Sequence, residues 1–192
     1  MSSARKAGRP PEPTDLRELI LVACLSLLEE SVGTHDVTIA RVTKAAGCTA
    51  PSLYNYWPNR EALLAEASAR GWMRFEKGQV AADRLELPVD RLRARGEAYL
   101  SFAIDHPNLF QVLFMARSAD EGTGPTFTAL VEDVAEAVRT GALAPVDPSA
   151  RALDLWAAVH GVSALAYANP AFAEHAARAT LARLTDALLP RR

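Results

Sequence analysis

The sequence predicts an all-α protein of about nine helices, and three observations support this fold class. Ala, Leu, Glu and Arg dominate the chain, and all four favour helices. Runs of alternating β-branched and polar residues bounded by turns, which would indicate strands, are absent from the sequence. Apolar residues instead recur at steps of three and four, interrupted by Pro, Gly and capping residues. A chain of 192 residues can form one domain, or a small module fused to a larger one.

The N-terminal region predicts an arm followed by a first helix. Residues 1–13 are basic, rich in Pro and without apolar period, so we expect a flexible arm. Asp15 and Glu18 have the spacing of a capping box, which predicts a helix beginning near Thr14 or Asp15. This helix has a core-facing apolar stripe and ends near residues 31–33.

Two short helices follow, joined by a tight turn. Thr38 caps a helix over 39–46 that ends at Gly47, and Thr49 caps a helix from Ala50 to about Tyr56. Helices this short are unstable alone and must be held by their neighbours. The pattern predicts a helix-turn-helix, whose second helix fits a DNA major groove about 12 Å wide. Its outer face presents polar and aromatic groups suited to bases and phosphates, namely Thr49, Ser52, Asn55 and Tyr56.

The rest of the chain continues as helices separated by Pro and Gly signals. The predicted ranges are 60 into the 80s, 88–104, about 109–117, 125–139, 148–168 and from the Asn169-Pro170 pair to Leu189. We therefore expect three parts: the arm at 1–13, a helix-turn-helix DNA-binding domain at 14–60, and a helical ligand-binding and dimerisation bundle at 61–192.

Charge and composition fit a protein that contacts nucleic acid through one small face. The net charge is only −2, but residues 37–60 contain Arg41, Lys44 and Arg60 and no acidic residue. No apolar run approaches the length of a membrane span, and the polar N-terminus lacks a signal-peptide core, so we expect a cytoplasmic protein without membrane contact.

The two cysteines, Cys24 and Cys48, are expected to be small apolar residues in a reducing compartment. A redox-sensor role for Cys48 is the alternative, but no neighbouring feature predicts a lowered thiol pKa.

One stretch also matches a known signature. The segment TIARVTKAAGCTAPSLYNYWPNREALLAEA resembles the DNA-binding motif of the TetR (tetracycline repressor) family of bacterial regulators. The matching pattern is a Thr cap, an Ala-Gly turn, Ser-x-x-Leu-Tyr and an aromatic-Pro-x-basic-Glu-x-Leu-Leu run. The later segments AYLSFAIDHPNLFQVLF and DLWAAVHGVSAL look like a subgroup whose ligand domain contains a Trp-x-x-x-His-Gly element.

The resemblance implies two sets of DNA contacts. The residues that would face the major groove are Thr49, Ala50, Ser52 and Asn55. The residues that would hold the phosphate backbone are Thr38, Tyr54, Tyr56 and Arg60. Trp57 stands where the family usually has Phe, and we expect it to be a core aromatic. Thr43, Tyr56 and Arg60 also depart from the common residues, which leaves the preferred DNA sequence open.

The basic residues of the arm, Arg5, Lys6 and Arg9, have two interpretations. They form a solvated tail, or they contact the minor groove or phosphates beside the helix-turn-helix.

The resemblance further implies a homodimer formed by the last two predicted helices, as a four-helix bundle across a two-fold axis. A dimer also follows from the DNA side, because one short recognition helix reads too few bases for useful specificity. The helix at 148–168 is apolar on two faces, as expected if one faces the interior and the other a partner.

A small-molecule effector is expected in the C-terminal bundle. Aromatic residues gather there, although any one of them could simply be core. The predicted contacts to an apolar or aromatic effector are Phe102, His106, Phe110, Phe114, Trp156 and His160. His160 could instead be a core histidine bonded to the backbone. The histidines and cysteines lack metal-ligand spacing, so we expect no metal, and no cofactor is predicted.

These inferences predict a transcriptional regulator that is released from a palindromic double-stranded operator by its effector, as a repressor. One alternative is a DNA-binding dimer without a small-molecule ligand, whose C-terminal domain serves dimerisation or protein contacts. A second is an enzyme using His106 or His160 with Asp105 or Asp154. The sequence disfavours it, because we find no nucleophile elbow, phosphate loop or metal box, and we expect no catalytic residues.

Overall fold

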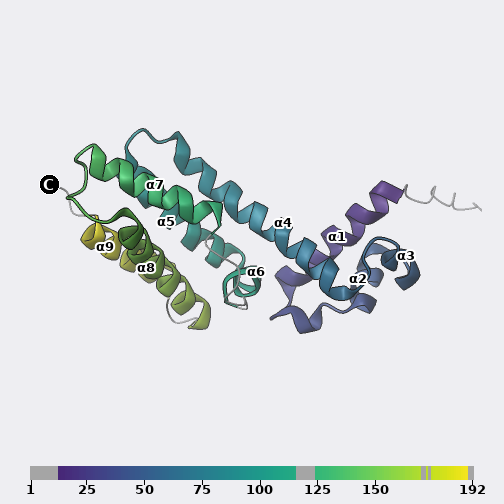
Figure 1. The fold of residues 1–192 in the computed structure, drawn as a ribbon. Coiled ribbons are helices and arrows are strands. Elements are labelled where there is room, and N and C mark those ends of the chain that lie inside the picture. Colours follow the sequence, from purple (N-terminus) through teal and green to yellow (C-terminus); the bar gives the residue numbers. More distant parts are fainter. Residues whose placement is uncertain (1–12, 116–123, 170–171, 173, 190–192) are drawn as a thin grey trace, which may run out of the picture. The chain divides into compact units, whose positions relative to one another are not determined.

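The computed structural model describes residues 13–115, 124–169, 172 and 174–189, and within these ranges every regular element is helical (Figure 1). The α-helices are α1 Pro13–Glu30, α2 Ile39–Ala46, α3 Ala50–Tyr54, α4 Arg60–Val80, α5 Pro88–Asp105, α6 Pro107–Phe110, α7 Pro125–Arg139, α8 Pro148–Ala168 and α9 Glu174–Leu188. Short 3-10 turns follow α1 and α4. Over the described ranges, the predicted all-α class and its count of about nine helices are confirmed. No helix among the described residues has the length and apolar content needed to cross a membrane.

The chain divides into two compact units, Met1–Arg70 and Gly71–Arg192. The first contains α1, α2, α3 and the start of α4. Its core is built on the inner face of α1, where Ile20, Leu21, Cys24 and Leu28 are all inaccessible to solvent. These apolar residues recur at steps of three and four, so they lie on one face of α1, and this face is buried in the core.

Capping residues determine where the two short helices begin and end. The Thr38 side chain accepts a hydrogen bond from the Arg41 amide, and Gly47 ends α2 with a φ of 66°. The Thr49 side chain accepts in the same way from the Ser52 amide. Such caps satisfy backbone groups that the first and last helical turns leave unpaired. These predicted boundaries are confirmed.

Helix α3 is shorter than predicted and ends at Tyr54. The amides of Tyr56 and Trp57 both donate to the carbonyl of Leu53, at 3.0 and 3.2 Å. The backbone therefore closes into a turn before Pro58, and the third helix does not extend to Tyr56.

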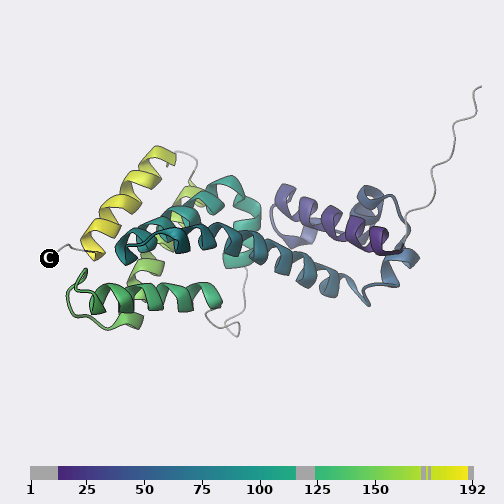
Figure 2. The ribbon, with the colours of Figure 1, turned by 90° about the horizontal axis from the view of Figure 1, so that it is seen from above.

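The second unit packs α5, α7, α8 and α9 against one another (Figure 2). Helix α8 contacts α5, α7 and α9, and α5 contacts α7 and α9 as well. One apolar cluster joins these elements and consists of Leu92, Val134, Ala137, Leu143, Ala152, Leu155 and Leu189. Burial of such side chains stabilises the bundle by about 1.5–3 kcal/mol for each large residue.

Two helix boundaries in this unit differ from the prediction. The helix expected at about 109–117 begins earlier, because Pro107 fits the first turn of α6, and it continues as a π-helical turn at Gln111–Met115. Helix α9 begins at Glu174 rather than directly after the Asn169-Pro170 pair, and Pro170 lies outside the described residues.

Candidate nucleic-acid interface and ligand cavity

The first unit presents α3 with a polar outer surface. Thr49, Tyr54 and Asn55 are exposed, and Tyr54 retains 49% of its accessible surface. Ala50 and Ser52 are half-buried, and the Ser52 hydroxyl lies 2.9 Å from that of Thr49. On the inner side, Leu53 is fully buried and anchors the helix. An anchored helix with small polar groups on its outer face can present them to base edges in a groove.

The residues expected to hold phosphates lie at the ends of α2, α3 and α4. Thr38 is exposed at the start of α2, and Tyr56 is half-buried after α3. Arg60, at the start of α4, donates from Nε to the carbonyl of Val37 at 2.8 Å and from one Nη to the carbonyl of Thr34. Arg60 therefore also fastens α4 to the segment that leads into α2.

Trp57 is held in the core of the first unit by two charged side chains. It is 3% exposed, and its indole N–H donates to Oε2 of Glu66 at 2.8 Å. The Arg17 guanidinium lies 5.1 Å from the centre of the indole ring and 2.7 Å from Glu66. This cation–π contact and ion pair join α1, the turn after α3 and α4. Trp57 is thus a core residue, as predicted from the sequence.

The two cysteines sit in different environments within this unit. Burial raises the pKa of the Cys24 thiol to about 11. Desolvation also raises the pKa of the half-buried Cys48 thiol. A raised pKa keeps both sulfurs in the less reactive thiol form at neutral pH.

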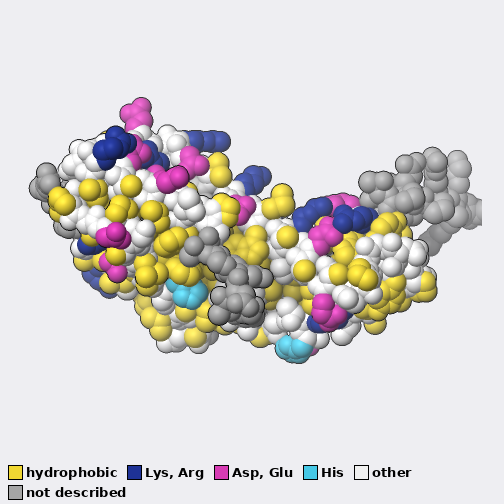
Figure 3. Space-filling view, viewed as in Figure 1, with side chains coloured by type: hydrophobic (Ala, Val, Ile, Leu, Met, Phe, Trp, Pro, Cys, Tyr) yellow, Lys and Arg dark blue, Asp and Glu magenta, His cyan; other side chains and the backbone are white. Residues whose placement is uncertain are grey.

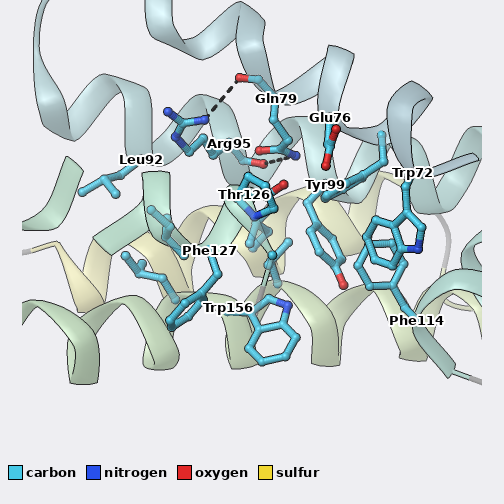
Figure 4. A pocket seen from close by; sticks show the side chains of 18 of the residues that line it. Trp72, Glu76, Gln79, Leu92, Arg95, Tyr99, Phe114, Thr126, Phe127 and Trp156 are labelled. Carbon is cyan, nitrogen blue, oxygen red and sulfur yellow. Dashed lines mark hydrogen bonds between the residues drawn. The ribbon is translucent and has the colours of Figure 1, made fainter. Parts of the chain in front are cut away.

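The second unit encloses a cavity of about 550 Å³, which is within the size range of small-molecule sites. Helices α4, α5, α7, α8 and α9 contribute its walls (Figure 4). Six aromatic side chains line it: Trp72, Phe75, Tyr99, Phe114, Phe127 and Trp156. The polar residues in its wall are Glu76, Gln79, Arg95, Thr126 and Thr185.

Helical periodicity explains how α4 and α5 face this cavity. On α4, Trp72, Phe75, Glu76 and Gln79 follow the i, i+3, i+4, i+7 spacing of one helix face. On α5, the same spacing is given by Leu92, Arg95, Gly96 and Tyr99. Each helix therefore presents one continuous face to the cavity, with both apolar and polar members.

The structure brings some of the predicted effector contacts to the cavity. Phe114 and Trp156 line it, whereas Phe102, His106, Phe110 and His160 are not among its lining residues. Phe102 and Phe110 are buried behind the wall, and Phe110 stacks on Phe114 with ring centres 5.2 Å apart.

His160 joins the cavity wall through Tyr99. The phenolic oxygen of Tyr99 lies 2.9 Å from Nδ1 of His160. Burial raises the pKa of Tyr99, and desolvation lowers the pKa of His160. Both groups are therefore neutral at pH 7, with the Tyr99 hydroxyl able to donate to the imidazole.

One residue of the cavity wall, Arg95, belongs to a partly buried ion-pair network. Arg95 is 7% exposed and donates from Nε to Asp133 at 2.6 Å and from one Nη to Asp83 at 2.5 Å. Arg91 also donates to Asp133, at 2.7 Å, and pairs with Glu136. The network joins α5, α7 and the 3-10 turn Ala81–Arg84. On the face of the molecule shown in Figure 3, by contrast, basic and acidic side chains are intermixed at the surface.

Sequence reasoning missed Glu76, Gln79, Arg95 and Tyr99 as cavity residues. The available signal was the spacing of polar residues within the faces of α4 and α5, where Glu76, Gln79 and Arg95 alternate with aromatic and apolar positions. That spacing shows that they share a face, but it does not show which partner the face meets.

The described part of α8 leaves an apolar stripe uncovered. Leu153, Ala157, Gly161 and Leu165 succeed one another at steps of four and are all exposed, with Leu153 at 52% and Leu165 at 57%. On α9, Leu184 is 39% exposed. A Cβ at Gly161 would meet no atom within 4 Å. A close approach by another helix is therefore possible along this stripe.

Two family models match the chain. The model described as bacterial regulatory proteins, tetR family, matches residues 20–67. The model described as tetracyclin repressor-like, C-terminal domain, matches residues 92–188. Together they cover the helix-turn-helix and most of the unit that contains the cavity. Among curated proteins, none matches this chain.

Several solved structures share the fold. A protein of unknown function from Rhodococcus sp. RHA1 has a TM-score of 0.76 and 24% identity, covering 91% of this chain and 93% of that one. A TetR transcription regulator from Haloarcula marismortui has a TM-score of 0.75 and 21% identity, covering 92% and 99%. AibR in complex with isovaleryl coenzyme A and operator DNA has a TM-score of 0.67 and 20% identity, covering 92% and 100%.

Proposed function

Because the chain belongs to the tetR family of bacterial transcriptional regulators, we propose that it is a repressor released from its operator by a small apolar or aromatic effector. The observation that supports this most directly is the aromatic cavity of about 550 Å³ in the unit that follows the helix-turn-helix in the sequence. Such a regulator works beside the bacterial chromosome, which agrees with the expected cytoplasmic location.

We assign α3 as the recognition helix, with Thr49, Ala50, Ser52 and Asn55 facing the major groove. Exposure of Thr49 and Asn55 supports this assignment, since it leaves both side chains accessible to base edges. Phosphate contacts are assigned to Thr38, Tyr54, Tyr56 and Arg60. For Arg60, the two bonds to backbone carbonyls would orient the guanidinium. Its other Nη, which lies 3.6 Å from the exposed carboxylate of Glu61, would contact a phosphate.

The proposed operator is a palindromic DNA duplex read by a homodimer. The exposed stripe on α8 and the exposed Leu184 on α9 support a dimer through the last two helices. We also assign the C-terminal half to the Trp-x-x-x-His-Gly subgroup, on the basis of Trp156, His160 and Gly161. A two-fold dimer would place two recognition helices about one turn of DNA apart.

The effector would release the operator by a population shift. A ligand that binds more tightly to the conformation with wrongly spaced recognition helices lowers the affinity for the operator, and operator DNA lowers the affinity for the ligand by the same factor. The solved AibR structure contains both a coenzyme A thioester and operator DNA, so a protein of this fold binds both kinds of molecule.

A DNA-binding dimer without a small-molecule ligand is the second candidate. The cavity argues against it, because a mostly apolar cavity of this size with a few polar groups in its wall is typical of a small-molecule site. The two candidates predict different outcomes in a ligand screen.

The test begins by selecting bound duplexes from a random DNA library with the full-length protein. We expect an inverted repeat, and we expect Asn55→Ala to change the selected sequence, with the lost base contact worth about 1–3 kcal/mol. Tyr54→Ala is expected to weaken binding to every duplex. Lys77→Ala, an exposed change on the α4 surface, is the control. Failure to select any duplex would contradict the DNA-binding assignment. A neutral aromatic library that changes neither operator affinity nor thermal stability would favour the ligand-free candidate.

A further inference from the structure

Among the described residues that line the cavity, none balances the charge of Glu76. The residue is half-buried on α4, one turn after Trp72, and within the described structure it forms neither a hydrogen bond nor an ion pair. Figure 4 shows it between Gln79 and Trp72, with Tyr99 beside it. Its basic neighbours on α4, Arg74 and Lys77, are exposed and do not line the cavity.

The charged group of the opposite sign in the wall, Arg95, is already neutralised. Its guanidinium donates to Asp133 and Asp83, and its remaining Nη lies 3.4 Å from the carbonyl oxygen of Gln79. Each of the three guanidinium nitrogens of Arg95 therefore already has an acceptor within the protein. An anionic ligand group would therefore have to break a buried ion pair before Arg95 could bind it, which is costly.

The aromatic rings around Glu76 are arranged as a cluster. Trp72 lies 4.7 Å from Phe114, and Phe75 lies 5.3 Å from Tyr99, measured between ring centres. The opposite wall adds Phe127 and Trp156, 5.9 Å apart. Faces and edges of such rings attract a desolvated organic cation, and a nearby carboxylate adds a direct charge attraction.

We propose that the cavity selects a lipophilic cation, an aromatic or bulky apolar molecule with a positive charge, and that Glu76 is its counter-ion. This inference rests on the proposed effector role of the cavity and specifies its chemistry. The apolar body would occupy the space between the aromatic walls, and the charge would lie against the Glu76 side of α4. An anion of the same shape would face Glu76 with no free cationic group among the described lining residues to compensate.

The test uses two organic ions of the same shape and opposite charge, tetraphenylphosphonium and tetraphenylborate. Isothermal titration calorimetry on the full-length protein measures the affinity of each. We expect the phosphonium to bind at least about tenfold more tightly than the borate, a difference of about 1.4 kcal/mol. Glu76→Gln, which keeps the shape and removes the charge, is expected to abolish this preference. Glu132→Gln, an exposed change on α7 outside the cavity, is the matched control and is expected to keep it.

A neutral probe separates this inference from the proposed effector role. N-phenyl-1-naphthylamine fluoresces on entering an apolar site, and the wild type and Glu76→Gln are both expected to bind it. If it binds but the borate equals or exceeds the phosphonium, or if Glu76→Gln keeps the preference, the counter-ion role of Glu76 is wrong and the effector cavity stands. If none of the three probes binds, both assignments fail. Circular dichroism checks that Glu76→Gln is folded; if it is not, the wild-type comparison of the two ions decides.

Discussion

The phenolic oxygen of Tyr99 and Nδ1 of His160 lie 2.9 Å apart and join α5 to α8 at the edge of the cavity. Because desolvation lowers the pKa of His160, the folded protein binds a proton there less readily than the unfolded chain does. As the pH falls below about 6.5, His160 takes up a proton in the unfolded state but stays neutral in the folded state, so the free energy of unfolding decreases. Above that pH the two states carry the same charge at this position.

We therefore expect His160→Gln to flatten the loss of stability between about pH 7 and pH 5.5, since glutamine can accept the Tyr99 hydrogen bond without titrating. Urea unfolding across this pH range measures the effect. The control is His175→Gln, an exposed histidine on α9. A pH profile for His160→Gln that parallels the wild type would show that this histidine does not titrate differently in the two states.

The Glu66 carboxylate is expected to stabilise the DNA-binding unit through Trp57. Glu66→Ala would leave the buried indole N–H without its acceptor, at a cost of about 1–3 kcal/mol. Chemical denaturation gives the change in the free energy of unfolding. Glu61→Ala removes an exposed carboxylate from the same helix and should change stability by less than about 0.5 kcal/mol. Equal effects of the two variants would mean that the indole hydrogen bond contributes nothing.

Asp133 is expected to be the most sensitive member of the network beside the cavity. Asp133→Ala would remove the shared acceptor of Arg91 and Arg95 and leave the buried Arg95 poorly compensated, which costs about 3–5 kcal/mol. Thermal unfolding of this variant against Glu132→Ala, its exposed neighbour on α7, measures the difference. A melting temperature within a degree of the control would contradict the assigned role.

The stripe on α8 predicts how the protein associates. Leu165→Arg would place an unpaired charge in the proposed dimer interface, where burial of one charge costs several kcal/mol. We expect sedimentation to show a dimer for the wild type and a monomer for this variant, with operator binding weakened at least about tenfold. Leu85→Arg, at a leucine 41% exposed before α5, should remain dimeric. A dimeric Leu165→Arg would place the interface elsewhere.

Local signals made much of the fold predictable, while the cavity depended on contacts between distant residues. Thr38, Gly47 and Thr49 each act within one turn of chain, so the boundaries that they set could be read from the sequence. The pairing of Arg95 with Asp133 joins residues 38 positions apart, and no local spacing indicates it. Phe102 and Phe110 were sensible candidates for the cavity by their chemistry. Whether they face the cavity or the core depends on helix packing, which periodicity alone does not supply.

The tryptophans provide intrinsic fluorescent reporters in both units of the protein. Trp57 is enclosed in the DNA-binding unit with Arg17 against its ring, while Trp72 and Trp156 line the cavity. These are all three tryptophans of the chain, so two Trp→Phe changes in the cavity leave one indole whose emission reports on the DNA-binding unit, and Trp57→Phe leaves two that report on the cavity. The fluorescence of such variants would show, without an attached dye, whether an event in one unit is sensed in the other, and how quickly.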